Sequence, residues 1–208
     1  MKFKWNFKQQ LLYNLFLLIL CCFFIIICAS LYDGEFNLRD VCISNLGNPE
    51  LNSRGWWIFS ICMCLMAILI IPHILYLYRN INFYSRILEQ IWLFLLIMGS
   101  IGMFFVGIVN EINYPTHLAF AAIAFGGYGL ALILALVIML VRVIKGEKWP
   151  NLVSYIIMAI FMSVLLGIII REIVVYGIRN PSDLNFTEWI AFFLIIGWIF
   201  SMTIIVKR

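Results

Sequence analysis

The stretch HLAFAAIAFGGYGLALILALVIMLV occupies residues 117–141 and contains no Asp, Glu, Lys or Arg. It is longer than the roughly 20 residues with which a helix crosses the ~30 Å hydrocarbon core of a bilayer. Within lipid, every backbone N–H and C=O must be paired inside the segment, and a helix achieves this. The stretch therefore predicts a transmembrane helix.

The same pattern recurs along the chain of 208 residues, of which 65% are apolar and 12% are charged. A soluble domain carries about 25% charged residues. Six apolar runs have membrane-spanning length: Leu11–Leu31, Trp56–Tyr78, Ile91–Val109, His117–Val141, Leu152–Val175 and Trp189–Val206. The sequence predicts an all-α fold, a polytopic integral membrane bundle of six transmembrane helices that forms a single domain over residues 1–208.

Basic residues predict the orientation of this bundle, because Lys and Arg accumulate in cytoplasmic connections. Most of the 14 basic residues fall on one side of the predicted membrane: Lys2, Lys4, Lys8, Arg79, Arg86, Arg142, Lys145, Lys148, Lys207 and Arg208. The opposite side holds Arg39, Arg54, Arg171 and Arg179. We therefore expect both termini to be cytoplasmic.

The first outer connection, Tyr32–Gly55, is the longest. Loops of more than about 15 residues in compact proteins usually have a function or are disordered. This loop contains apolar residues among its polar ones, so we expect it to fold onto the outer end of the bundle. Cys42 is the only cysteine outside the apolar runs, and both a free thiol and a disulfide to Cys28 or Cys62 remain open.

Small residues predict one helix–helix contact. Gly127, Ala131 and Ala135 recur every four residues and so share one face of the fourth predicted helix. Such a face allows a neighbouring backbone to approach closely. Glycines of the third run are expected to receive it: Gly99, Gly102 and Gly107.

Glu111 and His117 interrupt the apolar sequence between the third and fourth runs. A helix dipole disfavours a carboxylate at the C-terminus and a cation at the N-terminus by about 0.3–1 kcal/mol each. Either both groups are solvated in an interfacial turn, or Glu111 has a hydrogen-bond donor and His117 is neutral. In the second case they form a candidate acid–base pair, and they are the candidate catalytic residues of this chain.

Arg171 and Glu172 lie within the fifth run, where ionisable groups are usually paired and often functional. Arg171 is the expected donor for Glu111. Asn185 and Glu188 fit a capping-box-like start of the sixth helix. Only two histidines are present, on opposite sides of the predicted membrane, which excludes a zinc site with three histidine ligands. We predict no metal and no cofactor.

Two segments resemble a known family. ISNLGNPE, residues 43–50, resembles the first-loop motif of the DRAM/Frag/Sfk family of six-helix membrane proteins, although Asn45 stands where many relatives have Asp. HLAFAAIAFGGYG, residues 117–129, resembles the family's histidine followed by small residues, then Phe and Gly. A related, poorly characterised prokaryotic membrane family is also similar, since it has an acidic residue shortly before the same histidine, as Glu111 precedes His117. The resemblance implies association with lipid and no particular reaction.

We therefore expect a multi-pass protein of the plasma membrane or an endomembrane, with an outward-facing polar pocket that binds or helps remodel lipid head groups. A membrane-embedded lipid hydrolase or acyltransferase using His117 and Glu111 is one alternative. A non-enzymatic structural or regulatory protein is another. The expected partners are membrane lipids and not nucleic acids. The predicted pocket residues are Ser44, Asn45, Glu111, His117, Arg171 and Glu172.

Overall fold

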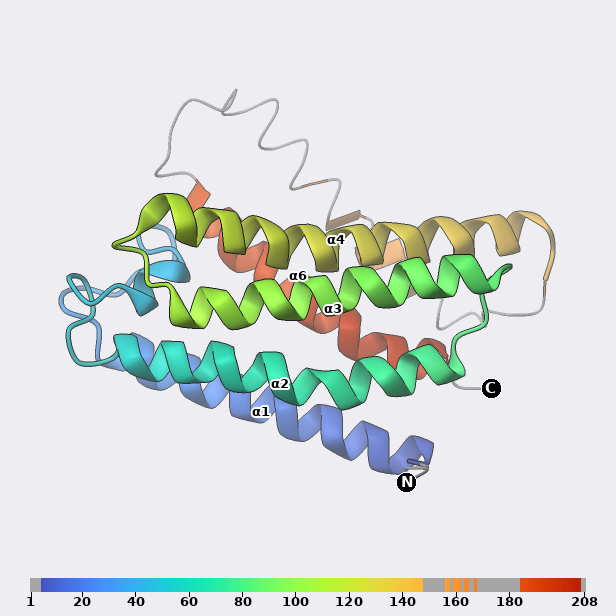
Figure 1. Ribbon diagram of the computed structural model, residues 1–208, viewed down its shortest axis with the longest axis horizontal. Helices are drawn as coiled ribbons and strands as arrows, with labels where there is room; N and C mark the ends of the chain where they lie inside the picture. The colour runs from blue at the N-terminus through green and yellow to red at the C-terminus, as the bar shows by residue number, and fades with distance from the viewer. Residues whose placement is uncertain are drawn as a thin grey trace.

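The computed structural model describes residues 5–147, 156–157, 159–161, 163–164, 167 and 184–206. Figure 1 shows the helices in this part of the chain, which are α1 (Phe7–Ser30), the short 3-10 helix η1 (Ser44–Gly47), α2 (Trp56–Asn80), α3 (Arg86–Ile108), α4 (Tyr114–Ile144) and α6 (Leu184–Ile205). Five of them are long and apolar enough to cross a membrane. The described residues therefore form an all-helical, multi-pass membrane fold, as predicted. Most of the predicted run Leu152–Val175 lies outside the described residues.

The first helix begins one turn earlier than its apolar run predicted. Asn6 caps it, because the backbone N–H of Gln9 donates to Asn6 Oδ1 (2.9 Å) and the N–H of Asn6 donates to Gln9 Oε1 (3.0 Å). This reciprocal pair is a capping box, which satisfies two donors that a helix start leaves unpaired. Polar Gln10 therefore lies inside α1 and is fully buried.

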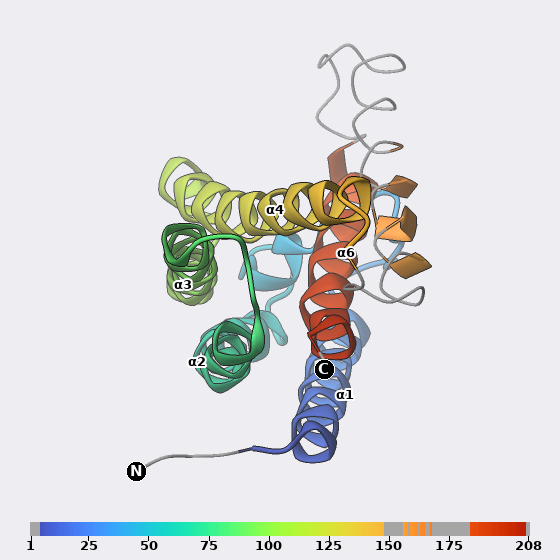
Figure 2. The same cartoon turned by 90° about the vertical axis from the view of Figure 1, so that its right-hand side faces the viewer.

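The helices form an elongated bundle with two distinct ends. Consecutive helices α2, α3 and α4 are antiparallel, and α3 lies between α2 and α4, while α6 lies between α4 and α1 (Figures 1 and 2). The loop of residues 31–55 and the start of α6 lie at one end, which we call the loop end. The start of α1 and the end of α6 lie at the other, which we call the terminal end (Figure 1).

Glycines bring α3 and α4 into close contact, as predicted. A Cβ atom on Gly127 would lie 2.5 Å from the backbone N of Gly99, and a Cβ atom on Gly102 would overlap the backbone of Ala124. Ala131 and Ala135, on the same face as Gly127, are fully buried. The third predicted glycine, Gly107, instead faces α2, where a Cβ atom would lie 2.7 Å from Ser60 O.

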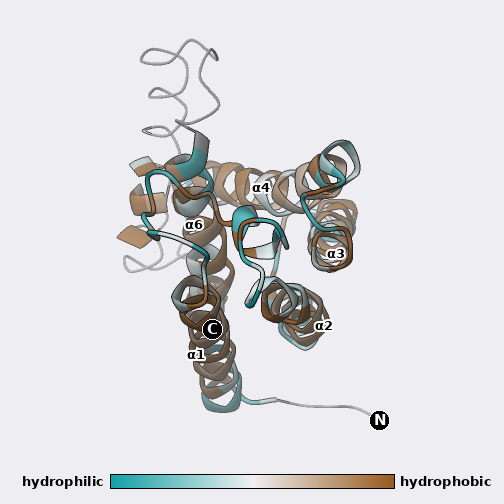
Figure 3. Ribbon diagram, turned by 90° about the vertical axis from the view of Figure 1, so that its left-hand side faces the viewer, coloured by the Kyte–Doolittle hydropathy of each residue, from teal (hydrophilic) through white to brown (hydrophobic). Residues whose placement is uncertain are grey.

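The long loop packs onto the helices at the loop end. Ile43 and Leu46 are buried against the helices, and Asn52 is buried and donates to Cys28 O (3.2 Å) and Leu46 O (3.0 Å). Figure 3 shows the hydrophilic residues of the loop over mostly hydrophobic helices. The predicted folding of this loop onto the bundle is confirmed. All six cysteines have free thiols, so neither Cys42–Cys28 nor Cys42–Cys62 is a disulfide.

A buried polar network joins three helices nearer the terminal end. Gln10 Nε2 of α1 donates to His73 Nδ1 of α2 and to Asn14 Oδ1, each at 2.8 Å. His73 Nε2 donates to Ile199 O of α6 (2.9 Å), and Asn14 Nδ2 donates to Thr203 Oγ1 (2.7 Å). Since a carbonyl oxygen only accepts, His73 carries its proton on Nε2 and accepts from Gln10 on Nδ1. These bonds fix α1 and α6 to α2 within the apolar bundle.

Candidate functional site

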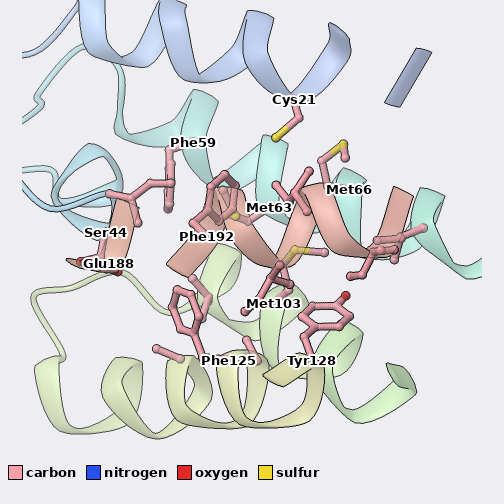
Figure 4. A pocket seen from close by; sticks show the side chains of 18 of the residues that line it. Cys21, Ser44, Phe59, Met63, Met66, Met103, Phe125, Tyr128, Glu188 and Phe192 are labelled. Carbon is pink, nitrogen blue, oxygen red and sulfur yellow. The ribbon is translucent and has the colours of Figure 1, made fainter. Parts of the chain in front are cut away.

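A narrow cavity of about 70 Å³ lies inside the bundle at its loop-end half. Its walls come from α1, α2, α3, α4, α6 and the loop, and are mainly Met, Phe and Ile side chains, including Phe59, Met63, Met66, Met103, Phe125 and Phe192 (Figure 4). A single water needs only about 10–15 Å³ of such space. The volume of the cavity therefore exceeds the space that a single water molecule needs.

The cavity is long for its volume. Its wall extends from His117 to Tyr128 along α4 and from Glu188 to Ile199 along α6. Each interval spans roughly 16 Å at the helical rise of 1.5 Å per residue. At the deep end, the hydroxyl of Tyr128 is hydrogen-bonded to Ser100 Oγ (2.9 Å). The lining of the cavity therefore extends from the loop end toward the middle of the bundle.

Three polar residues, Ser44, His117 and Glu188, line the loop end of the cavity. Ser44 and Glu188 lie side by side there (Figure 4), and Ser44 Oγ donates to Glu188 Oε2 at 3.5 Å. Glu188 also interacts with the Cys42 thiol and with the backbone of Ser44. We call these three residues the polar end of the cavity.

His117 has one nitrogen committed to the backbone. Its Nδ1 donates to the carbonyl oxygen of Val109 (2.7 Å), the residue that follows α3, and its side chain is only 5% exposed. The acceptor is a carbonyl, so the proton lies on Nδ1. His117 also occupies the first turn of α4, where the helix dipole disfavours a cation. The Nδ1–H of His117 is therefore committed to the end of α3, and the ring lines the cavity from the start of α4.

Cys42 lies behind Ser44. Its thiol is 3.1 Å from Ser44 Oγ and also interacts with Glu188. Burial, followed by the negative charge of Glu188, raises the pKa of Cys42 to about 12. Hence Cys42 is a neutral thiol at physiological pH.

Glu111 lies at the loop end but is held by loop amides. Asn45 Nδ2 donates to Glu111 Oε2 at 2.7 Å, and Asn48 Nδ2 donates to the same oxygen at 3.2 Å. Glu111 does not line the cavity. The predicted need of Glu111 for a donor is thus met by two asparagines, whereas the expected donor, Arg171, lies outside the described residues together with Glu172.

The predicted site residues fall into two groups. Ser44 and His117 line the cavity, while Asn45 and Glu111 form a neighbouring contact between the loop and the α3–α4 turn. The sequence interpretation missed Glu188, which it assigned to a helix cap. The structure instead has α6 already helical at Leu184, and Asn185 Nδ2 donates to Asp40 O (2.7 Å) of the loop. The sequence feature that could have indicated this position is a glutamate directly before the apolar run that begins at Trp189.

Nucleophilic catalysis requires a nucleophile within about 2.6–3.2 Å of its base. Among the described residues, the hydrogen bonds of Ser44 are to Cys42 and Glu188, and the bond of His117 is to Val109 O. Glu111 bonds to Asn45 and Asn48 and so does not orient His117. Among the described residues, His117 is thus not hydrogen-bonded to Ser44, Cys42 or Glu111.

The fold and the cavity define a multi-pass integral membrane protein with an apolar interior pocket. Residues 17–205 match the family described as "protein of unknown function (DUF998)", and the chain belongs to this family. This agrees with the expected likeness to an uncharacterised membrane family, and does not support the DRAM/Frag/Sfk resemblance. The comparison with curated proteins gave no match. The comparison with solved structures also gave none.

Proposed function

We propose that this protein binds one apolar chain of a membrane amphiphile inside its cavity, with the polar group of the amphiphile at Ser44, His117 and Glu188. The observation that supports this function is an apolar cavity that extends between the helices and ends beside Ser44, His117 and Glu188 at the loop end. Ligand sites are commonly apolar with a few polar groups that fix orientation. An amphiphile matches both parts at once.

The position of the cavity also supports a ligand drawn from the membrane. Its polar end lies beside the long loop, where the helices end, and its apolar part lies deeper between the helices (Figure 4). A membrane lipid has the same order, with its polar group at the interface and its chain in the hydrocarbon. The amphiphile would therefore enter without reversing its orientation in the bilayer.

The orientation of the bundle belongs to the same proposal. α4 ends at the terminal end and α6 begins at the loop end (Figure 1), so a six-crossing chain with both termini on one side accounts for the described helices. The basic residues favour the cytoplasm for the terminal end. We propose that the cavity faces the outer leaflet.

A matched pair of substitutions on α4 tests the binding function. Ala121 lines the cavity, whereas its neighbour Ala122 is exposed on the outside of α4. Ala121→Phe fills the cavity, and Ala122→Phe adds the same side chain elsewhere. Lipid copurified with each protein is extracted and identified by mass spectrometry. We expect a discrete amphiphile with wild type and Ala122→Phe that is depleted in Ala121→Phe.

Overpacking itself costs about 1–3 kcal/mol, so thermal unfolding of both variants must be followed in parallel. If folded Ala121→Phe retains the same lipid in the same amount as wild type, the cavity is not its binding site. If none of the three proteins carries a discrete lipid, and none binds one that is added, the structural or regulatory alternative is favoured. Turnover of the bound lipid would instead favour the hydrolase or acyltransferase alternative.

Cysteine labelling tests the orientation. In a protein without other cysteines, Ser53→Cys reports the loop end and Lys145→Cys reports the terminal end. A membrane-impermeant thiol reagent added to intact cells should label the first and not the second. Labelling of both from the same side would contradict the proposed topology.

A further inference from the structure

Two adjoining grooves lie at the terminal end of the bundle and share no residue with the cavity. They have volumes of about 360 and 570 Å³, within the range of about 300–1,000 Å³ that is usual for ligand sites. Four residues line both grooves: Trp5, Tyr76, Arg79 and Asn80. The start of α1 and the end of α2, from which these residues come, both lie at the terminal end (Figures 1 and 2). Because the two grooves share these residues, we treat them as one site, the terminal groove.

The larger part of the terminal groove has an apolar wall on α2, formed by Ile71, Pro72 and Leu75. Pro72 and Leu75 are exposed. Leu75 and Ile71 precede Arg79 by one and two turns of the helix, which is roughly 6 and 12 Å at a rise of 1.5 Å per residue. The wall therefore extends from Arg79 toward the middle of the membrane, in the direction that a lipid acyl chain takes.

The other side of the terminal groove has the residue types of a membrane interface. Trp5 and Tyr76 belong to the two residue types that are enriched where the bilayer meets water. Arg79 is exposed, and its guanidinium has five N–H donors, so it can bind a phosphate while keeping its contacts within the protein. The start of α1, at Asn6 and Phe7, lines the smaller groove, and its dipole favours an anion. It thereby offsets the end of α2, which disfavours one.

The charge around the terminal groove is positive. None of the described residues that line it is acidic. The acidic residues described at the terminal end, Glu89 and Glu147, are each paired with an arginine of α3 or α4, at 3.0 and 3.4 Å. Lys8 is exposed in the first turn of α1, and two more lysines, Lys2 and Lys4, precede it in the sequence. Basic residues beside a membrane helix attract anionic lipids.

We propose that the terminal groove binds an anionic phospholipid of the leaflet at the terminal end, with its phosphate at Arg79 and one acyl chain along Ile71, Pro72 and Leu75. This site is separate from the cavity and does not depend on the proposed function. A zwitterionic phospholipid has the same phosphate and chains, but its ammonium group gains nothing from a basic surface. The positive charge of the terminal groove therefore predicts selection by the net charge of the head group.

Two phospholipids with the same chains test this selection. Dioleoyl phosphatidylglycerol and dioleoyl phosphatidylcholine are added to the purified, delipidated full-length protein in a neutral detergent, and binding is measured by native mass spectrometry. We expect wild type to bind the anionic lipid at least about fivefold more tightly at low ionic strength. The difference should shrink at 1 M salt, where the Debye length is about 3 Å. Ala121→Phe should keep this preference, because Ala121 lines the cavity and not the terminal groove.

Two charge substitutions provide a matched comparison. Arg79→Gln removes the positive charge in the terminal groove, whereas Lys145→Gln removes one at the same end of the bundle, where Lys145 lies over the ring of Tyr84 (4.6 Å). We expect Arg79→Gln to lose the preference for the anionic lipid and Lys145→Gln to retain it. Leu75→Trp fills the apolar wall without changing the charge, so it should weaken binding of both lipids. This variant tests the site even if Arg79→Gln does not fold.

Three outcomes would overturn the inference. Equal binding of the two lipids by wild type would show that the terminal groove does not select by charge. Equal losses in Arg79→Gln and Lys145→Gln would show a general effect of net charge and no site at Arg79. Displacement of the anionic lipid by an equal concentration of glycerol phosphate would show that the apolar wall does not hold a chain. Each of these outcomes leaves the cavity proposal standing, since the Ala121→Phe comparison tests that separately.

Discussion

His117 Nδ1 lies 2.7 Å from the carbonyl oxygen of Val109 and so joins the first turn of α4 to the end of α3. The bond closes the turn between the two helices, and the same residue lines the cavity. One side chain therefore has a structural bond and, under the proposed function, a binding role that substitutions can separate.

His117→Asn and His117→Ala are expected to separate these roles. The Asn amide can place a donor near the position of Nδ1, so the bond to Val109 O is retained while the Nε2 acceptor is lost. We expect both variants to lose copurified lipid. Only His117→Ala should also lower stability, by about 0.5–1.5 kcal/mol for one hydrogen bond. Lipid analysis and thermal unfolding on the same samples measure the two effects.

Full lipid retention by folded His117→Asn would show that Nε2 does not contact the ligand. Equal loss of stability in both variants would show that Asn does not replace the donor. The two readouts therefore report on separate nitrogens of the ring.

The α3–α4 contact predicts opposite effects for adjacent glycines. A Cβ atom on Gly127 would lie 2.5 Å from Gly99 N and 2.7 Å from Leu95 O, both backbone atoms that cannot rotate away. A Cβ atom on Gly126 would meet nothing within 4 Å. We expect Gly127→Ala to destabilise the protein by about 1–3 kcal/mol. Gly126→Ala should be neutral or stabilising by up to about 1 kcal/mol, because Ala favours helix.

Thermal unfolding of the two variants in the same detergent measures this difference. Equal unfolding temperatures would mean that α3 and α4 are not packed at Gly99. The comparison needs no knowledge of ligand and therefore tests the fold alone.

Cys42 should react slowly with alkylating reagents. Burial and the charge of Glu188 raise its pKa from 9.0 to about 12, so its thiolate is about a thousandfold less populated at pH 8, at a factor of ten for each pKa unit. Alkylation is measured by mass spectrometry in a protein that retains only Cys42. The reaction should become fast when the protein is unfolded in denaturant.

The same shift has a consequence for stability against pH. The folded state holds the thiol proton more tightly than the unfolded state, so the contribution of Cys42 is complete below pH 9 and is lost as pH rises from about 9 toward about 12. Glu188→Gln removes a negative charge, which should lower the Cys42 pKa and accelerate alkylation. Rapid alkylation of the folded wild-type protein at pH 8 would contradict the burial of this thiol.

The helices and their packing were the most predictable features of this chain. Uninterrupted apolar runs of bilayer length have few alternatives to helix, and the spacing of Gly127, Ala131 and Ala135 specifies one face. The loop was predicted to fold onto the bundle because its apolar residues would otherwise face water at about 25 cal/mol per Å². Each of these inferences depends on residues close together in sequence or on composition.

A polar pocket at the outer end was expected, but the apolar cavity between the helices was not predictable, because it depends on how side chains from several helices fill one space. Local rules also misassigned two polar residues. Glu188 fitted a helix cap and instead lines the cavity, and Gln10 was placed before the first helix although it is buried within α1. In both cases the partner is distant in sequence, Ser44 for Glu188 and His73 for Gln10.

The network around His73 should behave as one unit. His73 accepts from Gln10 Nε2 (2.8 Å) and donates to Ile199 O (2.9 Å), and both side chains are fully buried. His73→Leu leaves a Gln10 donor and a carbonyl acceptor unpaired, so we expect a loss of about 1–3 kcal/mol in the free energy of unfolding.

Gln10→Leu should be destabilising in wild type and much less so in the His73→Leu background, because the unpaired donor is then removed. A coupling of about 0.6–1.7 kcal/mol is typical of hydrogen bonds between membrane helices. Unfolding temperatures of the two single variants and the double variant measure it, and strictly additive losses would mean that His73 and Gln10 do not interact in the folded protein.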